Sequence, residues 1–238
     1  MKDLRTVEIQ KSMKNWNGNT MKKDITSSLY FSHDMDDVHG AFIIRVKGHS
    51  LSETLANRCA ASCERVGQKY EFWDAYNGIE KRIVEPHHHN EVMSLIKLTN
   101  HYMSRGEVAC ALSHISLWVH CILLDKPIVI LEHDTIMLKP YTTHPLYNSI
   151  GYLGGREQII KKHEIKSIPP HESSGPNRHF ICRAHAYAID PIVAKNMLAH
   201  VLKMGIHAPA DIMMRTDLFQ LHQLDLFAYD LIDGDETT

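Results

Sequence analysis

The tripeptide Glu132-His133-Asp134 combines residue types that could bind a metal ion. It directly follows the apolar run from Ile128 to Leu131, which is typical of a strand buried on both faces. Alternate side chains of an extended chain point to the same side, so the carboxylates of Glu132 and Asp134 are expected to converge. Two carboxylates make a hard oxygen site that suits Mg²⁺ or Mn²⁺. Acids after a strand are also common as loop residues or helix caps, and the tripeptide alone leaves that alternative open.

The residues before this strand predict a helix and a turn. Ser104 and Glu107 have the spacing of a capping box, which closes unpaired amides at a helix start. Apolar residues then recur at intervals of four and three, as on one helix face: Val108, Leu112, Ile115, Val119 and Ile122. The turn Asp125-Lys126-Pro127 ends this helix, because proline disfavours helical backbone at the residue before it.

The residues from 41 to 78 predict a strand, a helix and a second strand. The strands are expected at 41–46 and 70–73. Ser50 and Glu53 form a second capping box, and Gly67 is placed to end the helix. The expected apolar face of this helix comprises Leu51, Leu55, Cys59, Cys63 and Val66. Strand, helix, strand is the opening of a nucleotide-binding α/β half.

The second half of the chain predicts further strands and one capped helix. A strand near residue 152 ends in Gly154 and Gly155, which either let the backbone approach a ligand closely or form a turn. A strand at 183–189 leads to Asp190, which is expected to cap a helix that Gly205 closes. Residues 166–178 are rich in Pro, Ser and Gly, and such a long loop is either a lid or disordered.

Length and composition indicate a single α/β domain with appendages. We expect a polar extension at 1–38, the domain at 39–230 and an acidic tail at 231–238. A net charge of −2 provides no basic field for nucleic acid, so no nucleic-acid partner is expected. Uninterrupted apolar runs are shorter than the roughly 20 residues that span a bilayer, which predicts no transmembrane segment. Five cysteines, an odd number, favour a reducing cytoplasm over a disulfide framework.

Histidine and cysteine clusters leave two readings each. The run from His87 to His89 could bind a transition metal, but a solvated polar loop is the expected reading. Cys59 and Cys63 lie one helical turn apart and could share a metal, but small buried core residues are the expected reading.

The motif Gly-Glu-x-x-Cys-x-Leu-Ser-His from Gly106, followed by Pro-Ile-x-Ile-Leu-Glu-x-Asp, resembles the core of family-25 glycosyltransferases. These are the lipooligosaccharide and procollagen galactosyltransferase relatives, in which the acidic tripeptide is the metal-binding "DxD" element. The turn from Phe72 to Gly78 is similar to the family's Phe-x-Asp-Ala-x-Asp-Gly, and Pro209-Ala210-Asp211 matches its Pro-x-Asp. The sequence Arg45-Val46-Lys47-Gly48 replaces the family's Asn-Leu-Asp-Arg signature.

The resemblance implies a GT-A-like α/β fold that binds a nucleotide sugar, with a mainly parallel central sheet flanked by helices. It implies a metal-dependent, inverting transferase that uses Mn²⁺ or Mg²⁺. The donor would be a UDP-sugar carrying galactose or glucose, and the acceptor a glycan or another hydroxyl compound in lipopolysaccharide biosynthesis.

Roles follow for individual residues. Asp134 is the expected direct metal ligand, with Glu132 acting through water or the ribose, and a third ligand is expected at His207 or His222. Asp211 is the candidate general base, although it could equally cap a helix after Pro209. The expected donor-binding residues are Arg45, Asp74, Ser113, His114, Gly154 and Gly155. Arg45 or Lys47 could meet the diphosphate or be a solvated charge, and His114 could equally be a core histidine.

Three functions remain open at this level. The first is the glycosyltransferase just described. The second is a metal-dependent hydrolase, in which the same carboxylates activate water and no acceptor sugar is needed. The third is a catalytically degenerate protein of the same fold that binds a glycan or a nucleotide without turnover.

Overall fold

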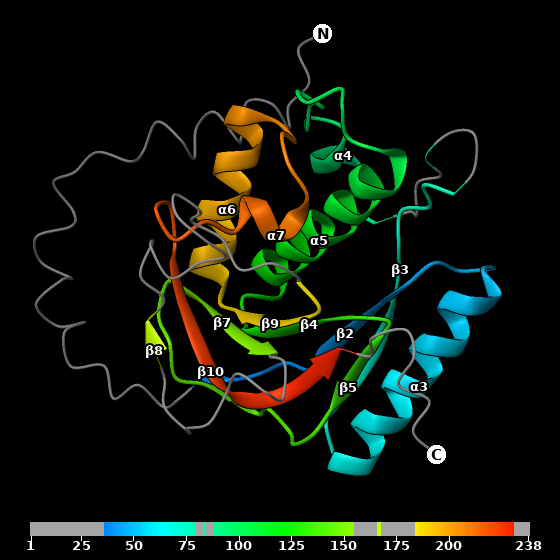
Figure 1. Ribbon diagram of the computed structural model, residues 1–238. Coiled ribbons are helices and arrows are strands. Elements are labelled where there is room, and N and C mark those ends of the chain that lie inside the picture. Colours follow the sequence, from blue (N-terminus) through cyan, green and yellow to red (C-terminus); the bar gives the residue numbers. More distant parts are fainter. Residues whose placement is uncertain (1–35, 80–82, 84–87, 155–165, 168–183, 231–238) are drawn as a thin grey trace, which may run out of the picture. The chain divides into compact units, whose positions relative to one another are not determined.

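The computed structural model describes residues 36–79, 83, 88–154, 166–167 and 184–230 (Figure 1). The chain divides into two compact units, Met1–Asp34 and Met35–Thr238. The first unit, the expected acidic tail at 231–238 and most of the expected lid at 166–178 lie outside the described residues. The fold below is that of the second unit.

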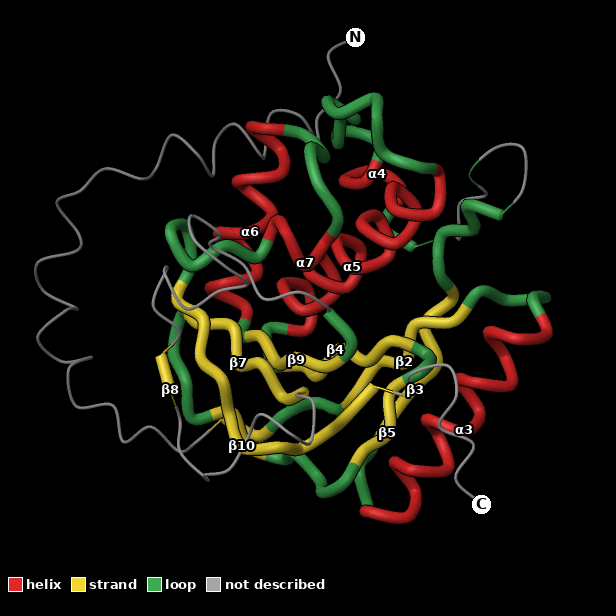
Figure 2. Tube along the Cα trace, in the orientation of Figure 1, coloured by secondary structure: helices red, strands yellow, loops and turns green. Residues whose placement is uncertain are grey.

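The central element is an eight-stranded sheet. Its strands are β2 (Ala41–Arg45), β3 (Tyr70–Asp74), β4 (Ile128–Glu132), β5 (Thr135–Met137), β7 (Ser149–Gly154), β8 (Lys166–Ser167), β9 (Ala186–Ile189) and β10 (Gln220–Asp230). Their order is β3-β2-β4-β9-β7-β10-β5, and β8 also pairs with β10 (Figure 2). Two short strands, β1 (Asp36–Asp37) and β6 (Thr143–His144), pair separately.

The sheet is mixed, so the expectation of a mainly parallel sheet is wrong. β2 pairs in parallel with β3 and β4, and β10 pairs in parallel with β7. In contrast, β9 runs antiparallel to both β4 and β7, and β5 and β8 run antiparallel to β10. β9 is buried along its whole length, so its residues have the uniform apolar pattern of a parallel strand although its direction is reversed.

Helices cover both faces of the sheet. They are α3 (Ser50–Val66), α4 (Asn90–Met93), α5 (Arg105–Leu124), α6 (Pro191–Met204) and α7 (Ala210–Met213). Figure 1 shows α5, α6 and α7 on one side of the strands and α3 on the other. The alternation of β2 fits this arrangement, since Phe42 and Ile44 belong to the core beneath α5 and α6, whereas Ala41 and Ile43 belong to the core beneath α3.

The ends of the long helices largely follow the sequence signals. The Ser104–Glu107 capping box is present, Asp190 caps α6 through the amides of Ile192 and Val193, and Gly67 ends α3 with a φ of 77°. The box expected at Ser50 is wrong, because the cap of α3 is His49, whose Nδ1 accepts from the Ser52 amide. The expected apolar face of α3 is also shifted, since Leu51 is 62% exposed.

α5 is long and apolar enough to cross a membrane by length and composition alone. Polar residues such as His114 and His120 interrupt it, which is why no uninterrupted apolar run revealed this property. In the structure 61% of the stretch is buried inside the protein, and the helix packs against α6. The structure therefore uses α5 as a core helix.

Candidate active site

Three of the predicted site residues lie along one edge of the sheet. The register pairs Arg45 of β2 with Asp74 of β3, and Ile44 of β2 with Glu132 of β4. Because β3, β2 and β4 are parallel neighbours, Arg45, Asp74 and Glu132 all stand at the carboxyl ends of their strands. Ligands of open α/β sheets bind in the crevice outside such ends.

Asp74 joins two cations at this edge. Its Oδ1 lies 3.3 Å from Arg45 Nε, and its Oδ2 lies 3.3 Å from Lys47 Nζ. The Arg45 guanidinium also stacks 4.2 Å above the centre of the Phe72 ring. The side chains of Arg45 and Asp74 are 24% and 30% exposed, so this small ion cluster lies partly in solvent. The structure thus brings together two of the residues predicted to bind the donor.

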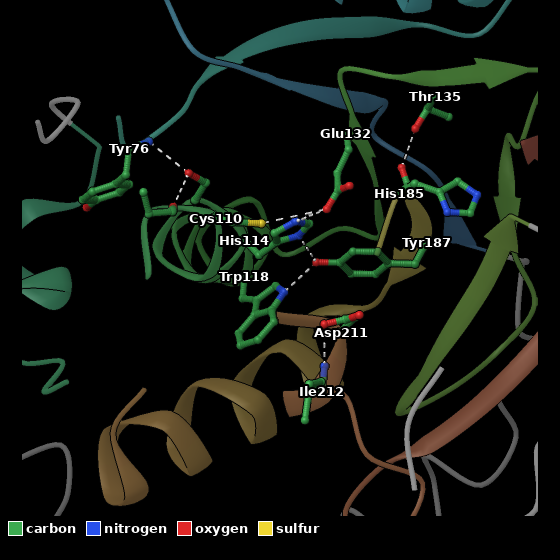
Figure 3. A network of polar contacts seen from close by, with 12 residues as sticks. Tyr76, Cys110, His114, Trp118, Glu132, Thr135, His185, Tyr187, Asp211 and Ile212 are labelled. Atoms are coloured by element: carbon green, nitrogen blue, oxygen red, sulfur yellow. Dashed lines mark hydrogen bonds and ion pairs between the residues drawn. The ribbon is translucent and has the colours of Figure 1, made fainter. Parts of the chain in front are cut away.

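Glu132 contacts the core helix α5. Its Oε1 lies 3.1 Å from His114 Nε2 and 4.0 Å from Cys110 Sγ (Figure 3). Cys110 and His114 are one turn apart on α5, so both reach the end of β4 from the same helix face. His114 is completely buried, Cys110 is exposed and the Glu132 side chain is 27% exposed. The predicted residue His114 therefore lies beside the predicted residue Glu132.

The pKa values of Glu132 and His114 are shifted in opposite directions. Burial acts to raise the pKa of the Glu132 carboxyl, but the hydrogen bond and charge of His114, followed by His185 and His133, outweigh it and leave this pKa lowered. Burial likewise acts to lower the pKa of His114, but Tyr187, Cys110 and Glu132 outweigh it and raise this pKa well above the ordinary value. Both pKa shifts favour the charged forms of the pair, an imidazolium and a carboxylate.

The rear side of His114 is held by two aromatic residues. His114 Nδ1 lies 2.8 Å from the Tyr187 hydroxyl, which also accepts a hydrogen bond from Trp118 Nε1 at 3.0 Å (Figure 3). Tyr187 and Trp118 are both buried. The imidazole is therefore fixed in the core from behind while its Nε2 faces Glu132.

The side chain of Ser113 is buried and hydrogen-bonded to the backbone. Its hydroxyl donates to the carbonyl of Ala109 at 2.8 Å and accepts from the amide of Tyr76 at 2.9 Å. Trp73 Nε1 similarly donates to the Ser116 hydroxyl at 2.9 Å. These contacts attach the end of β3, and the turn that follows it, to α5.

Asp134 lies in a turn and not in a strand. β4 ends at Glu132, residues 133 and 134 form the turn, and Thr135 begins β5. The alternation of an extended chain therefore does not carry from Glu132 to Asp134. The pKa of the buried Cys59 thiol on α3 is raised by its hydrogen bond to Cys63, then by burial, and further by the negative charge of Asp134. Asp134 is thus within electrostatic range of α3, whereas Glu132 contacts α5.

Cys59 and Cys63 themselves are free and buried in the core, as expected.

The absence of a side chain at Gly154 is explained by a neighbouring residue. A Cβ atom at Gly154 would overlap the imidazole of His185, which stands just before β9. His185 also lies 3.3 Å from the Tyr152 hydroxyl through Nδ1. The glycine therefore makes room for a histidine that raises the positive potential around Glu132. Gly155, the other predicted glycine, lies outside the described residues.

The two candidate third metal ligands lie in different parts of the fold. His222 pairs across β10 with Gly151 of β7, and the register continues through Ala188 to Val129 of β4. His222 therefore stands three strands from β4. Along the strands it is level with Val129, which precedes Glu132 in β4. His207 precedes α7, with Nδ1 3.1 Å from the Gly205 carbonyl and its ring against that of His200.

Asp211 lies in the first turn of α7, a short helix that packs on α5. Its Oδ1 accepts from the amide of Ile212 at 2.9 Å. The N-cap position belongs to Pro209, which makes no side-chain cap bond. Asp211 thus supports the start of α7 without being its cap residue, and Figure 3 draws it together with the network around Tyr187.

Sequence reasoning missed Cys110, Tyr187 and His185 as parts of this region. The four-residue spacing of Cys110 and His114 on a predicted helix was a usable signal, because it places both on one helix face. Tyr187 and His185 gave no such signal, since β9 reaches β4 only through the sheet pairing.

Comparison with known proteins identifies the family of this chain. The family model of glycosyltransferase family 25, described as a lipopolysaccharide biosynthesis protein, matches residues 49–214. A comparison with curated proteins finds no match. The matched stretch covers more than half of the chain and includes α5, the Glu132-His133-Asp134 tripeptide and Asp211. The chain therefore belongs to glycosyltransferase family 25 and is a glycosyltransferase.

Proposed function

We propose that this glycosyltransferase moves a hexose, galactose or glucose, from a UDP-sugar to a hydroxyl group of a glycan or similar acceptor, with inversion at the anomeric carbon. The observation that carries the proposal is the alignment of Arg45, Asp74 and Glu132 at the carboxyl ends of three adjacent parallel strands. We further propose that the donor lies across these carboxyl ends, which is where ligands of open α/β sheets bind.

Each side chain at the edge has a chemical task in this proposal. The diphosphate carries negative charge, and Arg45 and Lys47 provide cations that can form charge-assisted hydrogen bonds to it. Asp74, 3.3 Å from each cation, keeps both side chains at the edge before the donor arrives. The exposure of this cluster leaves it accessible to a nucleotide.

Mn²⁺ or Mg²⁺ would be bound directly by Asp134, and Glu132 would act through water or the ribose of the donor, because carboxylate oxygens are the ligand type that these ions prefer. Glu132 fits this role because only its Oε1 is engaged by His114 and Cys110 within the described part of the chain. When bound, the ion would supply Lewis-acid stabilisation of the charge that develops on the departing diphosphate. Because His222 stands three strands from β4 and His207 contacts Gly205 and His200, we leave both out of the proposed ligand set.

Asp211 is proposed as the general base. It would take the proton of the acceptor hydroxyl while that oxygen attacks the anomeric carbon from the face opposite the diphosphate, which inverts the configuration. α7 packs against α5, the helix that contacts Glu132. The proposed base and the proposed donor site are therefore both attached to α5.

Calorimetry of UDP binding tests the donor and metal parts together. Affinity for UDP should rise strongly when Mn²⁺ is added, and Asp134→Asn should remove this gain while the thermal unfolding curve stays cooperative. Asp125→Asn is the matched control, because Asp125 precedes β4 at its other end and asparagine tolerates its left-handed φ of 51°. Equal UDP affinity with and without Mn²⁺ in the parent protein would contradict the proposed metal dependence.

A product assay separates transfer from hydrolysis. Incubation with UDP-galactose or UDP-glucose should release UDP slowly alone and much faster with an acceptor glycan. Rapid release of free sugar that no acceptor accelerates would instead support a hydrolase.

A further inference from the structure

The strongest unexplained feature is the convergence of three different metal-ligand types. Cys110 Sγ, His114 Nε2 and Glu132 Oε1 all lie within 4.8 Å of one another. Among the described residues this is the one group of three or more such ligands that is close enough to hold a cation. The oxygen chemistry proposed for the donor's metal does not explain a thiol and an imidazole at this point.

The distances are near those of a tetrahedral zinc site. Zinc binds sulfur at about 2.3 Å and nitrogen or oxygen at about 2.0 Å, so ligand pairs stand about 3.3–3.6 Å apart. The observed separations are 3.1 Å between His114 Nε2 and Glu132 Oε1, and 4.0 Å between Cys110 Sγ and Glu132 Oε1. The third pair, Cys110 Sγ and His114 Nε2, lies within 4.8 Å. The two pairs with Glu132 therefore differ from the tetrahedral spacing by about 0.5 Å or less, and side-chain adjustment would bring all three atoms to one ion.

The ligands are held by rigid elements. Cys110 and His114 project from consecutive turns of α5, and Glu132 ends a strand buried in the sheet. The imidazole is oriented by Tyr187 at Nδ1, and Tyr187 is held by Trp118 Nε1. Such a partner on the second ring nitrogen of a histidine is a common support for metal-binding histidines.

The types of ligand and their exposure to solvent indicate which ion can bind. A thiolate and an imidazole prefer zinc-type cations over Mg²⁺ or Mn²⁺, which prefer oxygen ligands. Cys110 is exposed and Glu132 is 27% exposed, so an ion can enter from solvent. Three protein ligands leave the fourth tetrahedral position open. Zinc binds a thiolate and a neutral imidazole, so protons carried by these ligands would pass to solvent on binding.

We infer that Cys110, His114 and Glu132 form a zinc-type cation site, and that an ion bound there inhibits sugar transfer by withdrawing Glu132 from the donor's metal. The inhibitory part rests on the function proposed above, because it requires Glu132 to serve the donor. The binding part is independent of that function. In this proposal manganese supports sugar transfer through Glu132, and zinc inhibits transfer by binding the same carboxylate.

Co²⁺ tests the site without any assay of activity, because a thiolate ligand gives cobalt a charge-transfer absorption band in the near ultraviolet. The parent protein should show this band at one equivalent of Co²⁺, and Zn²⁺ should displace it. Cys110→Ser should abolish the band, and Glu132→Gln should weaken Co²⁺ binding by at least tenfold. Cys182→Ser is the control that changes another cysteine and should keep the band. A band that survives in Cys110→Ser would overturn the site.

Transfer assays with Mn²⁺ test the consequence. Zn²⁺ should lower the rate of the parent protein, whereas Cys110→Ser should need at least tenfold more Zn²⁺ for the same fractional inhibition of its own rate. A parent protein that shows the cobalt band but transfers sugar equally fast at saturating Zn²⁺ would overturn the inhibitory role. A protein that shows the band but has no transferase activity would contradict the proposed function and leave the binding site supported.

Discussion

His114 Nε2 lies 3.1 Å from Glu132 Oε1, and this contact joins the core helix α5 to the carboxyl edge of the sheet. His114 is completely buried, and its other nitrogen contacts the Tyr187 hydroxyl. One histidine thus connects the interior of the protein to the carboxylate at the candidate active site. The position of Glu132 consequently depends on the packing of α5 as well as on β4.

Tyr187→Phe should destabilise the protein. The change removes the hydroxyl that pairs with His114 Nδ1 and Trp118 Nε1, and both nitrogens are buried. Leaving buried polar groups unpaired costs about 1–3 kcal/mol each. Urea unfolding measures the loss, and Tyr102→Phe is the control because Tyr102 is fully exposed. Equal unfolding free energies for both variants would show that the hydroxyl network contributes nothing.

Acidification should destabilise the protein partly through His120. Burial, followed by the charges of His89, His39 and His88, lowers the pKa of His120 from 6.5 to about 4. The unfolded chain therefore binds more protons than the folded one between these values, so stability falls as pH drops from 6.5 towards 4. The slope is at most about 1.4 kcal/mol per pH unit, and solvent screening of the partly exposed ring reduces it.

His120→Gln should flatten this part of the stability curve. Chemical unfolding at pH 7 and pH 4.5 measures the difference, and His101→Gln is the control because His101 is exposed. If the parent and His120→Gln proteins lose the same stability over this range, the histidine does not titrate as described.

Gly154→Ala should destabilise the protein by crowding His185. The new Cβ would overlap the imidazole, and overpacking of this kind costs about 1–3 kcal/mol. A second change, His185→Ala, creates space and should make the combined loss smaller than the sum of the two. Gly106→Ala is a control in open surroundings. Additive losses would mean that His185 is not the reason for the glycine.

Asp211→Asn should slow sugar transfer by roughly 10²–10⁴-fold, the usual contribution of general-base catalysis. Asparagine keeps the size and the oxygen that accepts from the Ile212 amide, but it cannot take the proton of the acceptor. Affinity for UDP should stay unchanged, because the donor contacts come from other residues. Steady-state rates and calorimetry on one preparation distinguish these effects. A variant with the parent's rate would exclude Asp211 as the base.

The sequence by itself determined most of the local structure. The Ser104–Glu107 box, the Asp190 cap and Gly67 lie where they were predicted, because each signal acts within one or two helical turns. The strand before Glu132 was equally readable from its apolar run. The family motif around His114 and Asp134 also indicated the class of enzyme.

Only the tertiary structure decided how these elements meet. The reversed direction of β9 depends on pairing with strands far away in the sequence, and burial on both faces hides that direction. A turn after Glu132 ends the extended alternation from which the convergence of the two acids was predicted, and the contact of Glu132 with His114 of α5 comes from packing. Side-chain direction at a strand end depends on the neighbouring elements, and a two-residue spacing cannot specify it once the backbone turns.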